Sequence, residues 1–333
     1  MKTLIFKRYG KRDNVIFADT PRPAPKPDEI LVQVYAAGLN PIDTMIPKGT
    51  FKPFLKFQLP ATLGSDLAGV VAKVGNRVTR FKPGDAVFAS IFDLGIGSLA
   101  EYAIVPESVA ALKPANLDFV QAASIPMVGL TSWQALKERA NLKPGQKVFI
   151  PAGSGGIGTF AIQLAEHLGA KVGTTTSTAN VDLVRSLGAD EVVDYKKQEF
   201  EDLLRDYDAV LGTVRGDVLE KSLRILGPKS TIVSLIGPPD AAFARARGMN
   251  FLLVGVFGLL SRKIVRHAKK RGVAYSFLFV HPDGSQLAEI GELLKSGRIR
   301  PVIDKVFPFE QAKEALAYLE QGRAKGKVVV QMR

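Results

Sequence analysis

The sequence of 333 residues contains no cysteine and only three histidines, His167, His267 and His281. The lack of cysteine excludes disulfides, thiolate nucleophiles and every cysteine-based zinc site. The histidines are then the remaining soft metal ligands, which is too small a set to make metal chemistry a good explanation of the chain. We therefore predict a protein without a metal site.

Long apolar runs are also missing. The longest wholly apolar run, FLLVGVFGLL at 251–260, has ten residues, whereas a helix that spans the hydrocarbon core of a bilayer needs about 20. The opening residues, MKTLIFKRYG, contain too short an apolar stretch for the core of a signal peptide. We therefore expect a cytoplasmic protein without a transmembrane segment.

Composition indicates a folded protein with two domains. Hydrophobic residues make up 46% of the chain and charged residues 23%, which excludes disordered, collagen-like and disulfide-scaffold classes. A single hydrophobic core stops growing at roughly 250–300 residues. A chain of 333 residues is therefore expected to divide.

Positive charge is concentrated in one segment. The formal net charge is +13, and segment 241–272 contains eight lysines and arginines and no acidic residue. A basic surface of this kind favours an anionic partner. Aromatic residues near the basic run are sparse, which disfavours nucleic acid as that partner.

The pattern of apolar residues predicts an α/β protein. Short strand-like runs separated by turn signals fill the first 120 residues and predict a β-rich domain. From about residue 125, strand-like and helical runs alternate, which predicts parallel strands joined by helical crossovers. Six such strands are expected, at 147–151, 171–176, 191–193, 209–212, 231–236 and 276–280. The tail after 282 is expected to pack on the first domain, so the predicted division is 1–124 with 282–333 against 125–281.

A glycine-rich motif lies between the first of these strands and the helix that follows. AGSGGIG at 152–158 has Gly153, Gly155 and Gly158 in GxGxxG spacing. Such glycines allow a tight turn and a close approach of backbone to pyrophosphate, while the amides of the helix N-terminus face the anion. A glycine-rich turn without a ligand is the alternative, but the six-strand alternation around the motif favours dinucleotide binding.

The second strand of a dinucleotide-binding unit normally ends in an acid that binds the ribose diol. Here the stretch reads GTTTSTAN, and no carboxylate follows until Asp182. Thr176, Ser177 and Asn180 can instead donate hydrogen bonds to a 2′-phosphate. The sequence therefore favours NADPH over NADH, unless these are ordinary strand-end residues and either cofactor is accepted.

Seven motifs are spread along the chain: NPID (40–43), LGSDLAGVVAKVG (63–75), GSLAEYAIVP (97–106), AASIPMVGLTSWQAL (122–136), AGSGGIGTFAIQLA (152–165), LGADEVVDY (187–195) and GRAKGKVVV (322–330). Together they resemble the motifs of the zinc-free quinone oxidoreductase branch of the medium-chain dehydrogenase/reductase superfamily. Within that branch the resemblance is to the reticulon-4-interacting-protein-like members and the enone reductases.

This resemblance implies a GroES-like β-rich catalytic domain made from both chain ends and a central Rossmann domain with a six-stranded parallel sheet. It also implies hydride transfer from NADPH to quinones or α,β-unsaturated carbonyls. The residues expected to hold the pyrophosphate are Ser154, Gly155, Gly156, Ile157 and Gly158, and those expected to reach the adenosine phosphate are Ser177 and Tyr195. The other positions expected to line the cofactor are Thr213, Leu235, Leu278, Val280, Arg323, Ala324 and Lys325. Tyr195 has half-buried packing as an alternative role, and Arg323 and Lys325 could be solvated charges.

The resemblance also concerns catalysis. Zinc-dependent relatives place a cysteine at the position of Asn40 and a His-Glu pair at the positions of Ser65 and Asp66. Without zinc a carbonyl must be polarised by hydrogen bonds, so an already activated enone or quinone fits better than a simple alcohol. Asn40, Asp43 and Thr131 fall at the expected nicotinamide cleft and are the candidate catalytic residues. Turn formation and helix capping explain them equally well, and solvent could deliver the second proton to a quinone.

Two other functions stay open at this point. The chain could be an NADPH-responsive binding protein that contacts a membrane or nucleic acid through its basic surface and has little turnover. It could also act inside a biosynthetic assembly, as the enoyl reductase domains of polyketide synthases do. Either a monomer or a homodimer is compatible with the sequence.

Segment 249–272 is amphipathic, with an apolar decad followed by basic residues. One hypothesis is that it lies against an anionic membrane or covers the cleft for a lipophilic substrate. The preferred interpretation is that the decad is buried, either against the fifth and sixth strands or in a dimer interface, with the basic face solvated.

Overall fold

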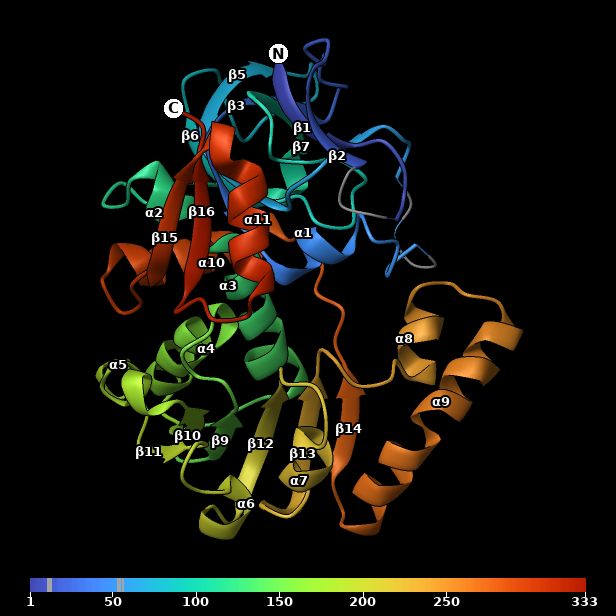
Figure 1. The fold of residues 1–333 in the computed structure, drawn as a ribbon, viewed down its shortest axis with the longest axis vertical. Coiled ribbons are helices and arrows are strands. Elements are labelled where there is room, and N and C mark those ends of the chain that lie inside the picture. Colours follow the sequence, from blue (N-terminus) through green and yellow to red (C-terminus); the bar gives the residue numbers. More distant parts are fainter. Residues whose placement is uncertain (11–13, 53–54, 56) are drawn as a thin grey trace. The chain divides into compact units, whose positions relative to one another are not determined.

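The computed structural model describes residues 1–10, 14–52, 55 and 57–333, which form two compact units (Figure 1). One unit combines both ends of the chain, Met1–Leu130 and His281–Arg333, and the other is Thr131–Val280. We call them the terminal unit and the central unit. The boundaries expected from the sequence, at 124/125 and 281/282, differ from these by a few residues because helix α3 (Pro126–Trp133) runs across the first boundary.

The terminal unit is built on two sheets. The smaller has the order β2-β1-β4, and the larger has the order β15-β16-β3-β5-β6-β8 with β7 also paired to β3. The strands are β1 (Lys2–Phe6), β2 (Val15–Asp19), β3 (Glu29–Leu39), β4 (Ala61–Thr62), β5 (Asp66–Val74), β6 (Ala86–Ser90), β7 (Tyr102–Pro106), β8 (Ala110–Leu112), β15 (Ile303–Pro308) and β16 (Lys327–Gln331). The helices wholly within this unit are α1 (Pro41–Met45), α2 (Phe119–Ala123), α10 (Gly284–Lys295) and α11 (Ala312–Glu320).

The C-terminal strand completes the larger sheet. β16 pairs antiparallel with β3, from Val328 opposite Leu39 to Gln331 opposite Ala36. Val328, Val329 and Val330 are fully buried, so this apolar run gains most of its stabilisation from removal of its side chains from water. The expectation that the tail packs on the first domain is confirmed, because one sheet contains strands from both ends of the chain.

The central unit is a parallel sheet with helical crossovers. Six strands lie in the order β11-β10-β9-β12-β13-β14, and every pair is parallel. They are β9 (Lys147–Ile150), β10 (Lys171–Thr176), β11 (Glu191–Asp194), β12 (Tyr207–Gly212), β13 (Leu226–Ser234) and β14 (Ala274–Phe277). The helices are α4 (Gly156–His167), α5 (Val181–Ser186), α6 (Phe200–Leu203), α7 (Val218–Ser222), α8 (Ala241–Ala246) and α9 (Phe251–Lys270). Within this unit the chain runs from β9 outward through β10 to β11 and then crosses back to β12. The point at which the strand order reverses therefore lies between β9 and β12.

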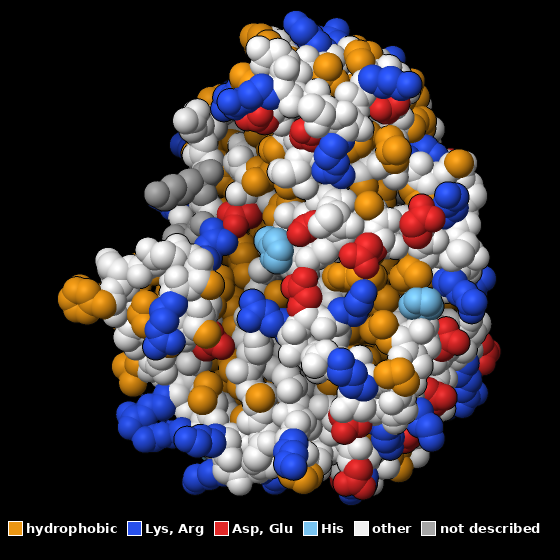
Figure 2. Space-filling view, turned by 180° about the vertical axis from the view of Figure 1, so that it is seen from behind, with side chains coloured by type: hydrophobic (Ala, Val, Ile, Leu, Met, Phe, Trp, Pro, Cys, Tyr) orange, Lys and Arg blue, Asp and Glu red, His pale blue; other side chains and the backbone are white. Residues whose placement is uncertain are grey.

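Helix α9 corrects one prediction. The apolar decad 251–260 is not buried against the fifth and sixth strands: of its ten residues, all of them described, Phe257 is the one buried side chain. The reason is helical periodicity, because one narrow stripe with Phe257, Ser261, Ile264 and Ala268 faces the unit. Figure 2 shows hydrophobic side chains projecting at the left edge of the molecule, with lysines and arginines below them. None of the helices in the described part of the chain is long and apolar enough to cross a bilayer.

Candidate functional site

A cluster of buried polar side chains lies in the terminal unit. It consists of Asn40, which precedes α1, Asp43 within α1, Ser65 and Asp66 at the start of β5, and Lys327 at the start of β16. None of them is more than 4% exposed. We call these five residues the buried polar network. Buried polar and charged groups are costly unless they bind one another, so the contacts inside this network decide whether it is stable.

Asn40 is the centre of the buried polar network. Its Nδ2 donates to Ser65 Oγ at 3.0 Å and to Asp66 Oδ2 at 2.8 Å. Its Oδ1 accepts a hydrogen bond from Lys327 Nζ at 2.5 Å. Lys327 Nζ also lies 3.5 Å from Asp66 Oδ2, and the backbone N–H of Met127 donates to both carboxylate oxygens of Asp66. One amide side chain thus joins three segments that are far apart in the sequence.

The charges of Lys327 and Asp66 compensate each other. Burial raises the pKa of Asp66, while the Lys327 ammonium and the hydrogen bonds from Asn40 and Met127 oppose that rise. Burial likewise lowers the pKa of Lys327, against the attraction of the Asp66 and Asp43 carboxylates. The attraction between the ammonium and the carboxylate, which share Asn40, thus opposes the neutral forms that burial favours.

Asp43 forms no ion pair among the described residues. Its Oδ2 accepts hydrogen bonds from the backbone N–H of Asn40 at 2.7 Å and from Ser65 Oγ at 3.1 Å. Its Oδ1 is buried and accepts no hydrogen bond from the described residues. Burial raises the pKa of Asp43 to about 7, against the lowering effect of those two hydrogen bonds. This carboxyl therefore exchanges a proton near neutral pH.

The capping role weighed for Asn40 and Asp43 is confirmed for the Asp43 side chain, which accepts from the backbone at the start of α1. Capping does not account for the contacts of the Asn40 side chain, which point to Ser65, Asp66 and Lys327 instead. Thr131 is buried on α3 and belongs to the central unit, so it is not a member of the buried polar network.

In the central unit the glycine-rich motif connects β9 to α4. A Cβ atom at Gly153 would lie 2.2 Å from Thr174 Oγ1, and one at Gly158 would lie 2.5 Å from the Ala152 carbonyl oxygen, so close packing requires both glycines. At Gly155 a Cβ would meet nothing nearer than 3.4 Å. The protein's own packing does not need a glycine there, whereas an anion at the helix N-terminus does.

The N-terminus of α4 fits an anionic group. Gly155 is the N-cap, and no side chain in the described part of the chain caps this helix. The first amides of a helix have no partner within it, and the helix dipole attracts negative charge to them. Gly156, Ile157 and Gly158 open α4, so three of the residues predicted to hold the pyrophosphate lie in the first turn of this helix, where anions are favoured.

Hydroxyl and amide groups gather where β10 ends. Ser154 Oγ accepts hydrogen bonds from Thr176 Oγ1 at 3.0 Å and from Asn180 Nδ2 at 3.2 Å. Asn180 Nδ2 also lies 3.2 Å from Ser177 Oγ. The nearby Tyr195 side chain is 58% exposed, and its backbone N–H donates to the carbonyl of Thr176. Thr176, Ser177 and Asn180 were expected from the sequence to bind a 2′-phosphate, and the resemblance added Ser154 and Tyr195; the structure brings these side chains to one end of β10.

One carboxylate near this group was missed from the sequence. Asp194 ends β11, beside the end of β10, and its Oδ2 accepts from Thr178 Oγ1 at 2.6 Å. The hydrogen bond from Thr178 is the main cause of its lowered pKa, and Lys197 Nζ lies 3.6 Å away. The sequence argument considered acids that follow the glycine motif directly, whereas parallel pairing of β10 with β11 brings in this one. The lysine and the Thr178 hydroxyl offset its charge.

The remaining cofactor candidates lie in two groups. Thr213 and Leu235 follow β12 and β13, where Thr213 Oγ1 donates to the Pro151 carbonyl at 3.0 Å. Leu278 follows β14, and Val280 comes two residues later. These positions share the carboxyl edge of the parallel sheet with the glycine motif, as expected of a ligand site in this architecture. The other group, Arg323, Ala324 and Lys325, lies in the turn between α11 and β16 of the terminal unit.

Comparison with known proteins places the chain in a family. Residues 26–115 match the alcohol dehydrogenase GroES-like domain, and residues 187–330 match a family described as zinc-binding dehydrogenase. The chain is 37% identical to the mitochondrial NAD(P)H oxidoreductase RTN4IP1 of Danio rerio, over 99% of this chain and 91% of that protein. It is 35% identical to a 2-methylene-furan-3-one reductase of Solanum lycopersicum, over 99% of this chain and 79% of that protein.

Solved structures agree with this assignment. The quinone oxidoreductase of Coxiella burnetii superimposes with a TM-score of 0.85 at 30% identity, over 100% of this chain and 99% of that one. The Escherichia coli quinone oxidoreductase in complex with NADPH gives a TM-score of 0.83 at 25% identity, with both chains fully covered. The chain belongs to the zinc-free quinone oxidoreductase branch of the medium-chain dehydrogenase/reductase superfamily. The predicted family, the fold class and the assignment as an oxidoreductase are thereby confirmed.

The buried polar network of this oxidoreductase does not fit a zinc ion, although one family description mentions zinc. The positions that hold zinc ligands in zinc-dependent relatives do converge, because Asn40 contacts both Ser65 and Asp66. Their donors already bind one another, and the Lys327 ammonium lies 2.5 Å from Asn40 Oδ1. A zinc ion there would face a positive charge and an incomplete set of ligands. Among the described residues no group of three or more His, Asp or Glu side chains could hold a metal ion.

Lys327 was missed in the sequence, although two signals pointed to it. Lys327 opens the strand KVVVQ, and the next three residues are fully buried. A lysine side chain at this position is therefore either buried with them or reaches the edge of the sheet. Asp66 likewise opens the apolar run DLAGVV. An isolated acid and an isolated base at the starts of two buried strands are candidates for a buried ion pair. Only the order of the strands in the sheet shows that the two side chains meet.

A first prediction concerns this pair. Lys327→Met leaves Asp66 buried without its cation, and we expect the free energy of unfolding to fall by about 3–5 kcal/mol. Adding Asp66→Asn should recover part of the loss, because the unpaired charge is then removed. Urea unfolding followed by circular dichroism measures both effects.

Lys325→Met is the matched control, since Lys325 is exposed and lies two positions away. An exposed substitution of this kind changes stability by no more than about 0.5 kcal/mol. If Lys327→Met were as stable as this control, the pair would contribute nothing to the fold.

A second prediction uses the pKa of Asp43. An aspartate in the unfolded chain titrates near about 3.9, whereas the pKa of Asp43 in the folded protein is about 7. Between these values the folded state binds more protons than the unfolded state, so this group lowers stability as pH rises, by up to about 1.4 kcal/mol per unit. Asp43→Asn removes that dependence. Its stability relative to the wild-type protein should therefore rise between pH 5 and pH 8 in urea unfolding experiments.

The exposed Asp182→Asn serves as the control for this measurement. Its stability relative to wild type should stay nearly constant over the same pH range. The assignment of a raised pKa to Asp43 is refuted if the two variants show the same pH dependence.

Proposed function

We propose that the protein reduces quinones or α,β-unsaturated carbonyl compounds by hydride transfer from NADPH, without zinc. The observation that carries the proposal is the buried polar network: Asn40, Ser65 and Asp66 stand where the resemblance places zinc ligands in zinc-dependent relatives, and here they bind one another and Lys327. A simple alcohol or ketone needs a Lewis acid, whereas an enone or a quinone is already electrophilic. The names of the relatives, which include NAD(P)H oxidoreductase and 2-methylene-furan-3-one reductase, support this substrate class.

NADPH, when bound, supplies the hydride. The pyrophosphate would lie at the N-terminus of α4, against Ser154, Gly155, Gly156, Ile157 and Gly158. The 2′-phosphate would lie beside Ser177 and Tyr195, with Asn180 as a further donor. Thr213, Leu235, Leu278 and Val280 would line the cofactor from the carboxyl edge of the sheet, and Arg323, Ala324 and Lys325 would contribute from the terminal unit.

We assign Asn40, Asp43 and Thr131 as the catalytic residues of this reaction. A hydride added to an enone leaves negative charge on the carbonyl oxygen, which a hydroxyl such as that of Thr131 can stabilise by donating a hydrogen bond. Asp43 can hold or release a proton near neutral pH, since its pKa is about 7 and its Oδ1 has no partner among the described residues. Asn40 would position Asp43 by donating its backbone N–H to Oδ2. For a quinone, solvent can supply the second proton.

The alternative function, an NADPH-responsive binding protein with little turnover, receives less support because the matched relatives are named as oxidoreductases. Cytoplasmic localisation stays a prediction, and the RTN4IP1 relative is named mitochondrial. The division into a catalytic domain of 1–124 with 282–333 and a cofactor domain of 125–281 also stays a proposal, as does the choice between monomer and homodimer.

The third prediction tests the function directly. The purified protein should oxidise NADPH, measured by absorbance at about 340 nm, in the presence of a panel of short-chain enones and benzoquinones. Simple ketones should give no rate above background. Because no zinc is required, prolonged treatment with EDTA should leave kcat unchanged, and metal analysis should find no stoichiometric zinc. Loss of activity to EDTA with recovery on adding zinc would contradict the zinc-free mechanism.

The fourth prediction concerns the cofactor. The wild-type protein should show a higher kcat/KM for NADPH than for NADH. Ser177→Asp places a carboxylate next to the 2′-phosphate, so the ratio of the two kcat/KM values should fall by about tenfold or more.

Ser177→Asn is the neutral control of similar size, and it should retain most of the preference. Equal use of NADPH and NADH by the wild-type protein would refute the assignment of Ser177 to a phosphate site.

A further inference from the structure

Helix α9 exposes an unusual amount of apolar surface. Phe251 is 81% exposed, Leu252 64% and Leu259 67%. Val256 and Leu260 are also among the exposed large hydrophobic side chains. The helix lies beside the edge strand β14 (Figure 1) and is held there through Phe257, Ile264 and Ala268, which are buried. These exposed residues form the N-terminal half of α9, over about 15 Å of helix axis.

Along the solvent-facing side, α9 changes from apolar to basic. Positions three, four and seven residues apart share one side of a helix, so the positions of Leu252, Val256 and Leu259 are continued along the helix by those of Arg266 and Lys270. The apolar and basic residues thus occupy successive halves of one exposed side. A helix arranged in this way presents both kinds of surface to a single partner.

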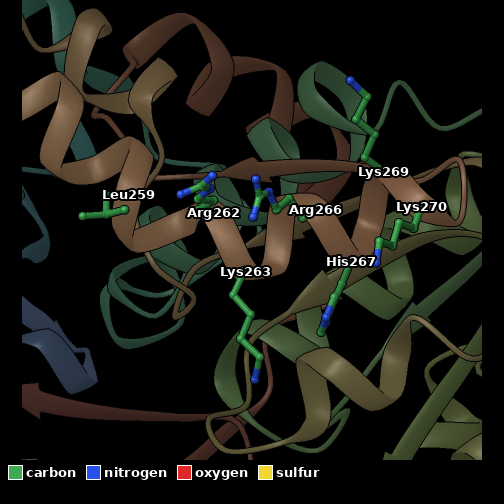
Figure 3. A pocket seen from close by; sticks show the side chains of 7 residues that line it. All are labelled: Leu259, Arg262, Lys263, Arg266, His267, Lys269 and Lys270. Atoms are coloured by element: carbon green, nitrogen blue, oxygen red, sulfur yellow. The ribbon is translucent and has the colours of Figure 1, made fainter.

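The basic half of α9 is short of negative charge. Lys263 forms an ion pair with Glu220 at 2.7 Å, and Arg271 donates to the Leu223 carbonyl. Among the described residues, Arg262, Arg266, Lys269 and Lys270 have no ion-pair partner. An open hollow of about 830 Å³ lies along this half, and its lining residues are Leu259, Arg262, Lys263, Arg266, His267, Lys269 and Lys270. Figure 3 shows these side chains on the helix. Arg262 and Arg266 extend to one side of the helix, and Lys263 and His267 extend to another.

The combination of an exposed apolar half and a basic half on one helix favours one kind of partner. A nucleic acid would satisfy the basic residues but would leave Phe251, Leu252 and Leu259 in water. A second copy of this chain would cover the apolar half but would offer the basic half no carboxylate from the same segment, because 241–272 contains no acid. An anionic bilayer offers phosphates to the basic half and a hydrocarbon boundary to the apolar half.

We propose that α9 docks the protein on the surface of an anionic membrane. The N-terminal half, 251–260, enters the interface between headgroups and acyl chains, and the C-terminal half meets the headgroup phosphates through Arg262, Arg266, Lys269 and Lys270. The contact is peripheral, since none of the helices among the described residues can cross a bilayer. It does not depend on the proposed reductase activity, because it involves binding alone.

Co-sedimentation with vesicles tests the proposal. The wild-type protein is mixed at low salt with vesicles of phosphatidylcholine alone or of phosphatidylcholine with about one third phosphatidylglycerol, and the bound fraction is measured. We expect binding to the anionic vesicles and much weaker binding to the neutral ones. Each lysine or arginine near an anionic surface strengthens binding by roughly fivefold. The variant Arg262→Gln/Arg266→Gln/Lys269→Gln/Lys270→Gln should therefore lose more than about 100-fold in affinity.

The control for charge changes four exposed basic residues elsewhere, Lys73, Lys82, Lys171 and Arg298, to glutamine. This variant has the same net charge as the first and should keep most of the binding. The apolar half is tested by Leu252→Gln/Leu259→Gln, which should lower affinity at least tenfold. Its control, Leu112→Gln/Leu203→Gln, alters side chains of comparable exposure away from α9.

Several results would overturn the proposal. Wild-type protein that stays in the supernatant with anionic vesicles at low salt would do so, as would equal binding by the α9 charge variant and its control. Sedimentation velocity and binding of a DNA duplex are measured in parallel. A dimer that Leu252→Gln/Leu259→Gln dissociates, or DNA binding that the charge variant abolishes, would assign α9 to that other partner if vesicle binding is absent.

Discussion

The buried pair of Lys327 and Asp66, joined through Asn40, is the interaction on which the terminal unit depends. It connects the start of β16, the start of β5 and the residue before α1, which are brought together from both ends of the chain. A buried charge without a partner is strongly destabilising. Pairing of β16 with β3 therefore places Lys327 where it compensates the buried Asp66, and the C-terminal strand stabilises the terminal unit through this pair.

The same interaction shapes the chemistry. By neutralising Asp66, Lys327 leaves Asp43 as the carboxyl without its own cation, and burial then raises the pKa of Asp43 to about 7. A group that changes protonation near neutral pH is suited to general acid–base catalysis. In this chain the Lys327 ammonium and the Asn40 amide already bind the other donors of the network, and Asp43 remains as its titratable carboxyl.

The central unit uses backbone rather than side chains for its main binding feature. The N-terminus of α4, the glycines around it and the hydroxyls at the end of β10 lie together at the carboxyl edge of the sheet and make up the anion site proposed for the cofactor. The basic residues of the chain do not gather at this site. They gather on α9, which lies beside β14, the last strand in the order of the sheet. The two anion-binding features proposed for this unit, one for a cofactor and one for a membrane, are therefore carried by separate elements.

Much of this architecture was determined by local sequence. The alternation of strand-like and helical runs from residue 125 specified the six parallel strands, because each element has its own apolar period, and the GxGxxG spacing specified the phosphate-binding turn. Tertiary structure alone decided the pairing of Lys327 with Asp66, since residues 261 positions apart meet only when β16 joins the sheet. It likewise brought Asp194 beside the end of β10 and left the apolar decad of α9 exposed. The period of the apolar residues in a sequence indicates that a helix has an apolar side. Which elements cover that side depends on the neighbours of the helix in the folded structure.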